Sequence, residues 1–180
     1  MWTLEYILSQ VCVLVAIAFF ISTTYIKNRK VVIFLNCFVN IFYAIQYVLL
    51  KSYTGVLINA IGLIRCIWFY FDTKSTKRDY VSLIVCFALA IGGGIFTYKS
   101  WVDIIALVGS LALTYGLWQP NLMLYRFLAI ANHICFIVYN TVHKSYIAVV
   151  FEAVVIILTA ISIIKFHLES KKINKNNEKA

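Results

Sequence analysis

Long apolar runs separated by short polar breaks dominate the sequence. A helix needs about 20 residues to cross about 30 Å of hydrocarbon. Seven runs approach that length: residues 4–24, 31–50, 53–71, 80–98, 101–118, 124–143 and 146–166. Because a lipid-exposed backbone has to satisfy its own hydrogen bonds, we expect each run to be a helix. The breaks at Lys51-Ser52 and His143-Lys144 are so short that they predict tight helical hairpins.

The composition indicates that lipid is the solvent for these helices. Of the 180 residues, 63% are hydrophobic and 13% are charged, whereas an ordinary soluble domain has about 45–50% and about 25%. A soluble domain of this size keeps much of its surface in water and cannot hide so many apolar side chains. The chain is therefore predicted to be all-α and polytopic, with a single transmembrane domain over residues 1–168.

The distribution of basic residues predicts how the helices are oriented. The breaks after the first and third runs and the C-terminal tail carry most of them: Lys27, Arg29, Lys30, Lys74, Lys77, Arg78, Lys171, Lys172, Lys175 and Lys179. The opposite side has Lys51, Lys99 and Lys144. By the positive-inside rule, we expect the N-terminus outside and the C-terminus in the cytoplasm. The lysine-rich tail over residues 169–180 is polar and is predicted to be cytoplasmic and disordered.

Several functional classes find no support in this pattern. The net charge is +9, but the basic residues sit at the ends of apolar runs and form no continuous face, so we expect no nucleic-acid partner. No nucleophile elbow, glycine-rich phosphate loop or HExxH motif is present, and we expect no enzyme. All five cysteines fall inside apolar runs without a CxxC pair, so we expect no disulfide, metal centre or cofactor.

A weak internal repeat runs through the chain at an offset of 93 residues. Lys51-Ser52-Tyr53 recurs as Lys144-Ser145-Tyr146, and Asn28 aligns with Asn121 in the same ungapped register. The repeat maps the first three runs (about 4–71) onto the last three (about 101–166) and leaves 80–98 as a linker helix. Four spans separate corresponding helices, so the two bundles point the same way. Parallel repeats of this kind place a binding site at their interface near the midplane.

Polar residues inside the apolar runs are the candidates for that site, since burying them in lipid is costly. Asn36, Asn40, Tyr43 and Tyr47 share one helical face. In the repeat, Asn40 aligns with His133, Asn59 with Glu152, and Tyr47 with Asn140. The predicted substrate-binding residues are Asn40, Asn59, His133, Asn140 and Glu152.

Simpler roles remain open for these residues. A transmembrane Asn often only hydrogen-bonds a neighbouring helix, which contributes about 0.5–2 kcal/mol. Glu152 is a stronger functional candidate because carboxylates are rare inside membranes; it is protonated, or paired with Arg65, His133 or Asn59. Arg65 lies about six residues from the cytoplasmic end of its run and is expected to snorkel there. Arg126 is expected to act as an orienting charge.

Three stretches resemble the YgjV family of bacterial inner-membrane proteins: Tyr25–Val31, Gly55–Arg65 and Glu152–Phe166. The resemblance covers nearly the whole chain and implies a location in the bacterial inner membrane. More distantly, the layout of three, one and three helices resembles the SWEET sugar carriers and the PnuC vitamin transporters. The Pro-Gln hinge of SWEET proteins and the tryptophan-rich motif of PnuC are absent, so neither substrate carries over.

Together these patterns favour a small transporter or facilitator for a polar metabolite, in which two bundles rock around a midplane cavity. The alternative is a non-transporting accessory or regulatory protein that binds another membrane protein. In that case the polar faces would be packed shut. The lipid bilayer is a partner under both hypotheses.

Overall fold

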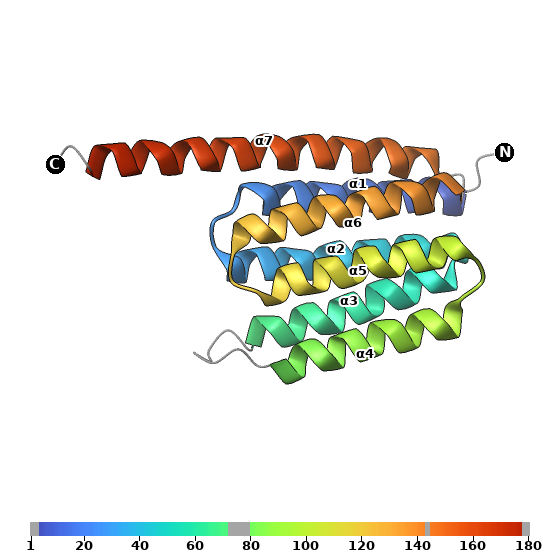
Figure 1. Ribbon diagram of the computed structural model, residues 1–180. Helices are drawn as coiled ribbons and strands as arrows, with labels where there is room; N and C mark the ends of the chain where they lie inside the picture. Colours follow the sequence, from blue (N-terminus) through green and yellow to red (C-terminus); the bar gives the residue numbers. More distant parts are fainter. Residues whose placement is uncertain (1–3, 72–79, 143–144, 178–180) are drawn as a thin grey trace.

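The computed structural model describes residues 4–71, 80–142 and 145–177, which form seven helices and no strand (Figure 1). In chain order they are α1 (Leu4–Tyr25), α2 (Arg29–Leu49), α3 (Tyr53–Phe71), α4 (Tyr80–Thr97), α5 (Trp101–Trp118), α6 (Leu122–Val142) and α7 (Tyr146–Asn177). The helices lie side by side and alternate in direction, so the α1–α2 and α5–α6 connections share one end of the bundle. We call this the C-terminal end, because α7 emerges from it. The all-α prediction is confirmed.

The helices have the length and composition of membrane spans. Six of those in the described ranges, all except α3, are long and apolar enough to cross a membrane. The 19 residues of α3 rise about 29 Å at 1.5 Å each, so α3 also reaches across the hydrocarbon. Large apolar side chains remain exposed on the outside of the bundle, Leu4, Ile95 and Phe96 among them. Such an apolar surface suits lipid and not water.

The helices group into two triplets with α4 between them. α2 packs against α1 and α3, and α6 packs against α5 and α7. The triplets meet where α1 packs on α7 and where α3 packs on α5. α4 touches α3 and α5 from the periphery: 17% of its span is buried, against 44% for α5. Corresponding helices of the two triplets run in the same direction, as the sequence predicts.

The two hairpins α2–α3 and α6–α7 close with similar backbone hydrogen bonds. The Ser52 amide donates to the Tyr47 carbonyl at 2.9 Å, and the Ser145 amide donates to the Asn140 carbonyl at 2.8 Å. Each serine carbonyl then accepts from the amide four residues later, at 3.1 Å in both hairpins. These bonds satisfy helix-end groups that would otherwise be unpaired in lipid.

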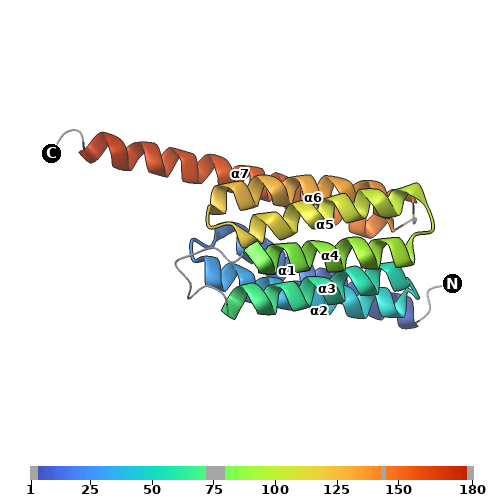
Figure 2. The same ribbon diagram turned by 60° about the horizontal axis from the view of Figure 1, so that its bottom comes forward.

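The C-terminal helix is longer than the sequence predicts. The polar, lysine-rich sequence predicts a disordered tail from residue 169, but α7 continues to Asn177 and projects beyond the other helices (Figure 2). Residues 169–177 contain neither Gly nor Pro, and adding residues to an existing helix avoids the cost of starting a new one. At the base of this extension the Lys27 ammonium donates to the Glu169 carboxylate at 2.9 Å.

The buried apolar side chains of the described residues form three clusters. One cluster lies near the C-terminal end, where Val32, Phe69 and Leu117 pack with Tyr125 at the ends of four helices. Another, formed by Val102, Ala106 and Tyr139, lies toward the opposite end. A third cluster, which includes Val13, Val39 and Val155, lies near the middle of the helices, where the polar residues Asn40 and His133 are also buried.

Candidate functional site: a polar cavity inside the bundle

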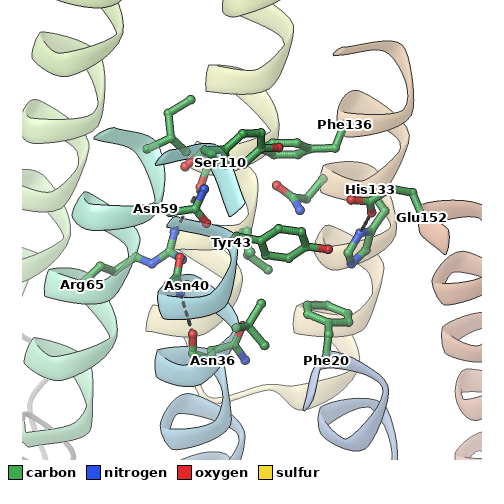
Figure 3. Close-up of a pocket in the computed structure, with 15 residues that line it drawn as sticks. Phe20, Asn36, Asn40, Tyr43, Asn59, Arg65, Ser110, His133, Phe136 and Glu152 are labelled. Atoms are coloured by element: carbon green, nitrogen blue, oxygen red, sulfur yellow. Dashed lines mark hydrogen bonds and ion pairs between the residues drawn. The ribbon is translucent and has the colours of Figure 1, made fainter. Parts of the chain in front are cut away.

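A cavity of about 60 Å³ lies in the middle of the bundle (Figure 3). Its lining side chains come from every helix except α4. One water molecule needs about 10–15 Å³ of such volume, so the cavity has room for a few waters or a very small ligand. The triplets α1–α3 and α5–α7 therefore both contribute to one central space.

The polar face of α2 lines this cavity as predicted, with Asn36, Asn40, Tyr43 and Tyr47 all at its surface. The Asn36 amide donates to the Val32 carbonyl at 2.8 Å, and the Asn40 amide donates to the Asn36 carbonyl at 2.6 Å. These bonds to the preceding turn hold the amides in place within the membrane.

Small residues on α3 allow it to approach α2 closely. A Cβ atom on Gly62 would lie 2.9 Å from the Asn40 Cγ, and one on Gly55 would lie 2.6 Å from the Tyr47 Cδ1. Both distances are shorter than carbon atoms tolerate, so the close approach requires glycine. On the same face, the Asn59 amide donates to the Gly55 carbonyl at 2.8 Å and its side chain lines the cavity.

His133 of α6 and Glu152 of α7 form a buried pair, with the imidazole Nδ1 against the carboxylate Oε2. Their exposures are 4% and 5%. The ring of Phe20 meets the imidazole edge-on, with centroids 4.4 Å apart. The opposite imidazole nitrogen, Nε2, has no hydrogen-bond partner among the described residues. Of the partners considered for Glu152, the structure places its carboxylate against His133.

Arg65 also lines the cavity, which corrects the prediction that it snorkels to the surface. Its side chain is 4% exposed, and Nη1 donates to the Thr114 hydroxyl at 2.6 Å and to the Ser110 carbonyl at 3.5 Å. These acceptors on α5 hold the guanidinium inside the bundle. The sequence did contain a signal, because Arg65 follows Gly62 by three residues and so shares its face of the helix.

Four of the five predicted site residues therefore lie around one cavity: Asn40, Asn59, His133 and Glu152. Asn140 is buried but does not line it. It lies two helical turns beyond His133, about 10 Å closer to the α6–α7 hairpin. Arg65, Ser110 and Asn132 line the cavity without having been predicted. No group of three His, Cys, Asp or Glu side chains in the described ranges is placed to hold a metal ion.

Two other arginines connect the triplets at the C-terminal end. Arg126 of α6 donates through Nε to the Thr24 carbonyl of α1 at 3.0 Å. Arg29 of α2 donates through Nη2 to the Leu117 and Trp118 carbonyls of α5, each at 2.8 Å. Each triplet thus supplies an arginine that satisfies the last carbonyls of a helix in the other, where a cation is also favoured by the helix dipole. Arg126 does more than orient the chain.

The comparisons with known proteins agree with this architecture. A protein-family model described as a bacterial inner membrane protein matches residues 7–170, which include nearly all of the bundle. No curated protein matches the chain, and no solved structure does. With a match over most of its length, the chain belongs to the YgjV family and is a multi-pass protein of the bacterial inner membrane.

Proposed function

We propose that the protein is a transporter or facilitator for a small polar solute, which passes through the central cavity. The observation that carries this proposal is that both triplets supply polar side chains to one space: Asn40 and Asn59 from the first, His133 and Glu152 from the second. Polar residues inside a membrane are costly unless they have a structural partner or a function. That these side chains meet at one shared cavity supports a role in binding a solute.

An internal repeat supports the proposed motion. Asn28 and Asn121, 93 residues apart, both accept hydrogen bonds at helix starts, from the amides of Lys30 at 3.0 Å and Met123 at 2.9 Å. The α2–α3 and α6–α7 turns correspond at the same offset. Two like-oriented repeats around a central site suit a rocking mechanism that exposes the site to each side in turn.

The C-terminal end of the cavity is closed in this conformation. The Tyr125 hydroxyl hydrogen-bonds to the Thr23 hydroxyl at 3.2 Å and accepts from the Asn36 amide at 3.3 Å. The apolar cluster around Val32 and Phe69 lies at the same end. Under the positive-inside rule this end faces the cytoplasm, so release into the cell would require these contacts to separate.

An accessibility measurement tests alternating exposure without knowledge of the solute. In a cysteine-free background, Ser110→Cys places a thiol in the cavity, and Ser82→Cys places one at a fully buried position of α4 that does not line it. A membrane-impermeant maleimide should label Ser110→Cys from either face of oriented vesicles and leave Ser82→Cys unlabelled. The mechanism is overturned if Ser110→Cys is labelled from one face only or from neither face.

An uptake comparison tests transport itself. Cells lacking the protein are complemented with wild type, Glu152→Gln or Glu169→Gln, and the uptake of a broad metabolite panel is measured. Wild type and Glu169→Gln should restore uptake of at least one solute, because Glu169 lies outside the cavity, whereas Glu152→Gln should not. Equal uptake in all strains argues against transport. A stoichiometric membrane partner recovered in mild detergent, together with an unlabelled Ser110→Cys, would indicate the accessory role instead.

A further inference from the structure

The solute class follows from the charge of the cavity, an argument that rests on the proposed function. We infer that the cavity binds a small carboxylate, with Arg65 as its counter-charge. The guanidinium of an arginine stays protonated in proteins. A charge buried in the membrane normally has a partner of opposite charge, because an unpaired one is costly.

The contacts of Arg65 with α5 do not supply that opposite charge. Nη1 binds a hydroxyl and a backbone carbonyl, both of them neutral. The Thr114 hydroxyl that accepts from Arg65 donates in turn to the Ser110 carbonyl at 2.7 Å. The Arg65 Nε has no hydrogen-bond partner among the described residues. The guanidinium of this cavity-lining arginine therefore retains a net charge, and its Nε is a buried donor without a partner.

The carboxylates in the described part of the chain are all placed elsewhere. Glu5 is exposed in the first turn of α1. The Asp103 carboxylate accepts from the backbone amides at the start of α5, and Glu169 accepts from Lys27. Glu152 binds His133, and Figure 3 shows this pair and Arg65 on opposite sides of the cavity with Tyr43 between them. None of the four forms an ion pair with Arg65.

The shape and size of the site favour a carboxylate of few atoms. The planar guanidinium fork matches the two oxygens of a carboxylate, and charge-assisted bonds of this kind are stronger than neutral ones. Asn40 and Asn59 line the same cavity and add polar groups beside the arginine. A volume of about 60 Å³ is well below the roughly 300–1,000 Å³ of pockets for drug-sized molecules. The expected ligand is a short-chain carboxylate.

A binding experiment separates this role from a purely structural link between α3 and α5. The full chain is purified as wild type, Arg65→Gln, Arg65→Lys and Lys30→Gln, the last removing an exposed cation outside the cavity. The probes are acetate, propionate and lactate, compared with acetamide, propionamide and chloride at constant ionic strength. The unfolding temperature in detergent is measured at increasing probe concentration, since a ligand that binds only the folded state raises it.

We expect at least one carboxylate to raise the unfolding temperature of wild type and Lys30→Gln, while its amide does not. Arg65→Gln should bind that carboxylate about 10- to 100-fold more weakly, as expected for the loss of a charge-assisted hydrogen bond. Arg65→Lys keeps the positive charge but loses the planar guanidinium fork, so its affinity for the carboxylate should lie between those of wild type and Arg65→Gln. It also tests the inference if Arg65→Gln fails to fold. The inference is overturned if no carboxylate acts on wild type, if amides or chloride act equally, or if both Arg65 variants respond like wild type.

The proposed function and this inference can fail separately. Labelling of Ser110→Cys from both faces does not depend on the charge of the solute. If Ser110→Cys is labelled from both faces but the protein binds no carboxylate, the transport proposal stands and the carboxylate inference is rejected. If a carboxylate binds in a way that depends on Arg65 but Ser110→Cys is labelled from neither face, the binding site stands and the transport proposal is rejected.

Discussion

The contact between Gly62 and Asn40 offers a direct test of how closely α2 and α3 pack. In Gly62→Ala the new Cβ would meet the Asn40 side chain, lying 2.9 Å from its Cγ. Asn40 cannot easily turn away, because its amide is held by the Asn36 carbonyl at 2.6 Å and lies 3.6 Å from the Cys66 sulfur. The substitution therefore forces either the side chain or the helix to move.

Gly92 of α4 provides a matched control, since a Cβ added there would have no neighbour within 4 Å. Replacing Gly by Ala in a helix stabilises it by about 0.5–1 kcal/mol at either position. This gain cancels when the two variants are compared. The remaining difference is the cost of overpacking, about 1–3 kcal/mol. Gly62→Ala should therefore have the lower free energy of unfolding by about that amount.

The assay is the free energy of unfolding in mixed detergent micelles, measured by denaturant titration of the two variants and wild type. A third comparison introduces Gly62→Ala into Asn40→Ala, where the obstructing amide is gone. The penalty should shrink there, as expected for two residues in direct contact. The reasoning is refuted if Gly62→Ala and Gly92→Ala differ by less than about 0.5 kcal/mol, or if removing the Asn40 amide leaves the penalty unchanged.

Three further substitutions test other contacts by the same unfolding measurement. Asp103→Ala removes the carboxylate that accepts from two backbone amides at the start of α5 and should cost about 1 kcal/mol; a stability equal to wild type would contradict that capping role. Glu169→Gln breaks an exposed ion pair with Lys27 and should cost no more than about 1 kcal/mol, with less effect in high salt. Glu152→Leu leaves the buried His133 imidazole without its hydrogen-bond partner and should cost about 1–3 kcal/mol, whereas adding His133→Leu should recover part of the loss; strictly additive losses would show that the two side chains are not coupled.

The number and order of the helices could be predicted from the sequence because a membrane span needs a long apolar run. Their starts were less predictable. The apolar pattern predicts a second helix over residues 31–50, but α2 begins at Arg29 because the Asn28 side chain accepts from the Lys30 amide and caps the helix. An apolar pattern begins at the first apolar residue, whereas a helix begins at its cap. The charged residues Arg29 and Lys30 therefore belong to the helix.

The candidate site was predictable where polar residues share a helical face, and less so where their role depends on another helix. The face of α2 and the presence of His133 and Glu152 followed from spacing and from the cost of polar groups in lipid. The prediction that Arg65 snorkels to the surface is wrong. It rests only on the distance of Arg65 from the helix end, which is short enough for the side chain to reach water. Only the positions of Thr114 and Ser110 on α5 show why it stays inside. Packing between distant parts of the chain cannot be obtained from the pattern of one helix.

The crossed arginines at the C-terminal end have a consequence for separated halves of the protein. A fragment ending after α3 would keep Arg29 but lose the carbonyls that it binds, and α1 would lose the guanidinium of Arg126. A fragment beginning at α5 would have the reciprocal defects. Neither half should reach its native packing when produced alone, while two halves made together in one cell should recombine. The hydrogen bonds that shut this end of the molecule also make each half dependent on the other.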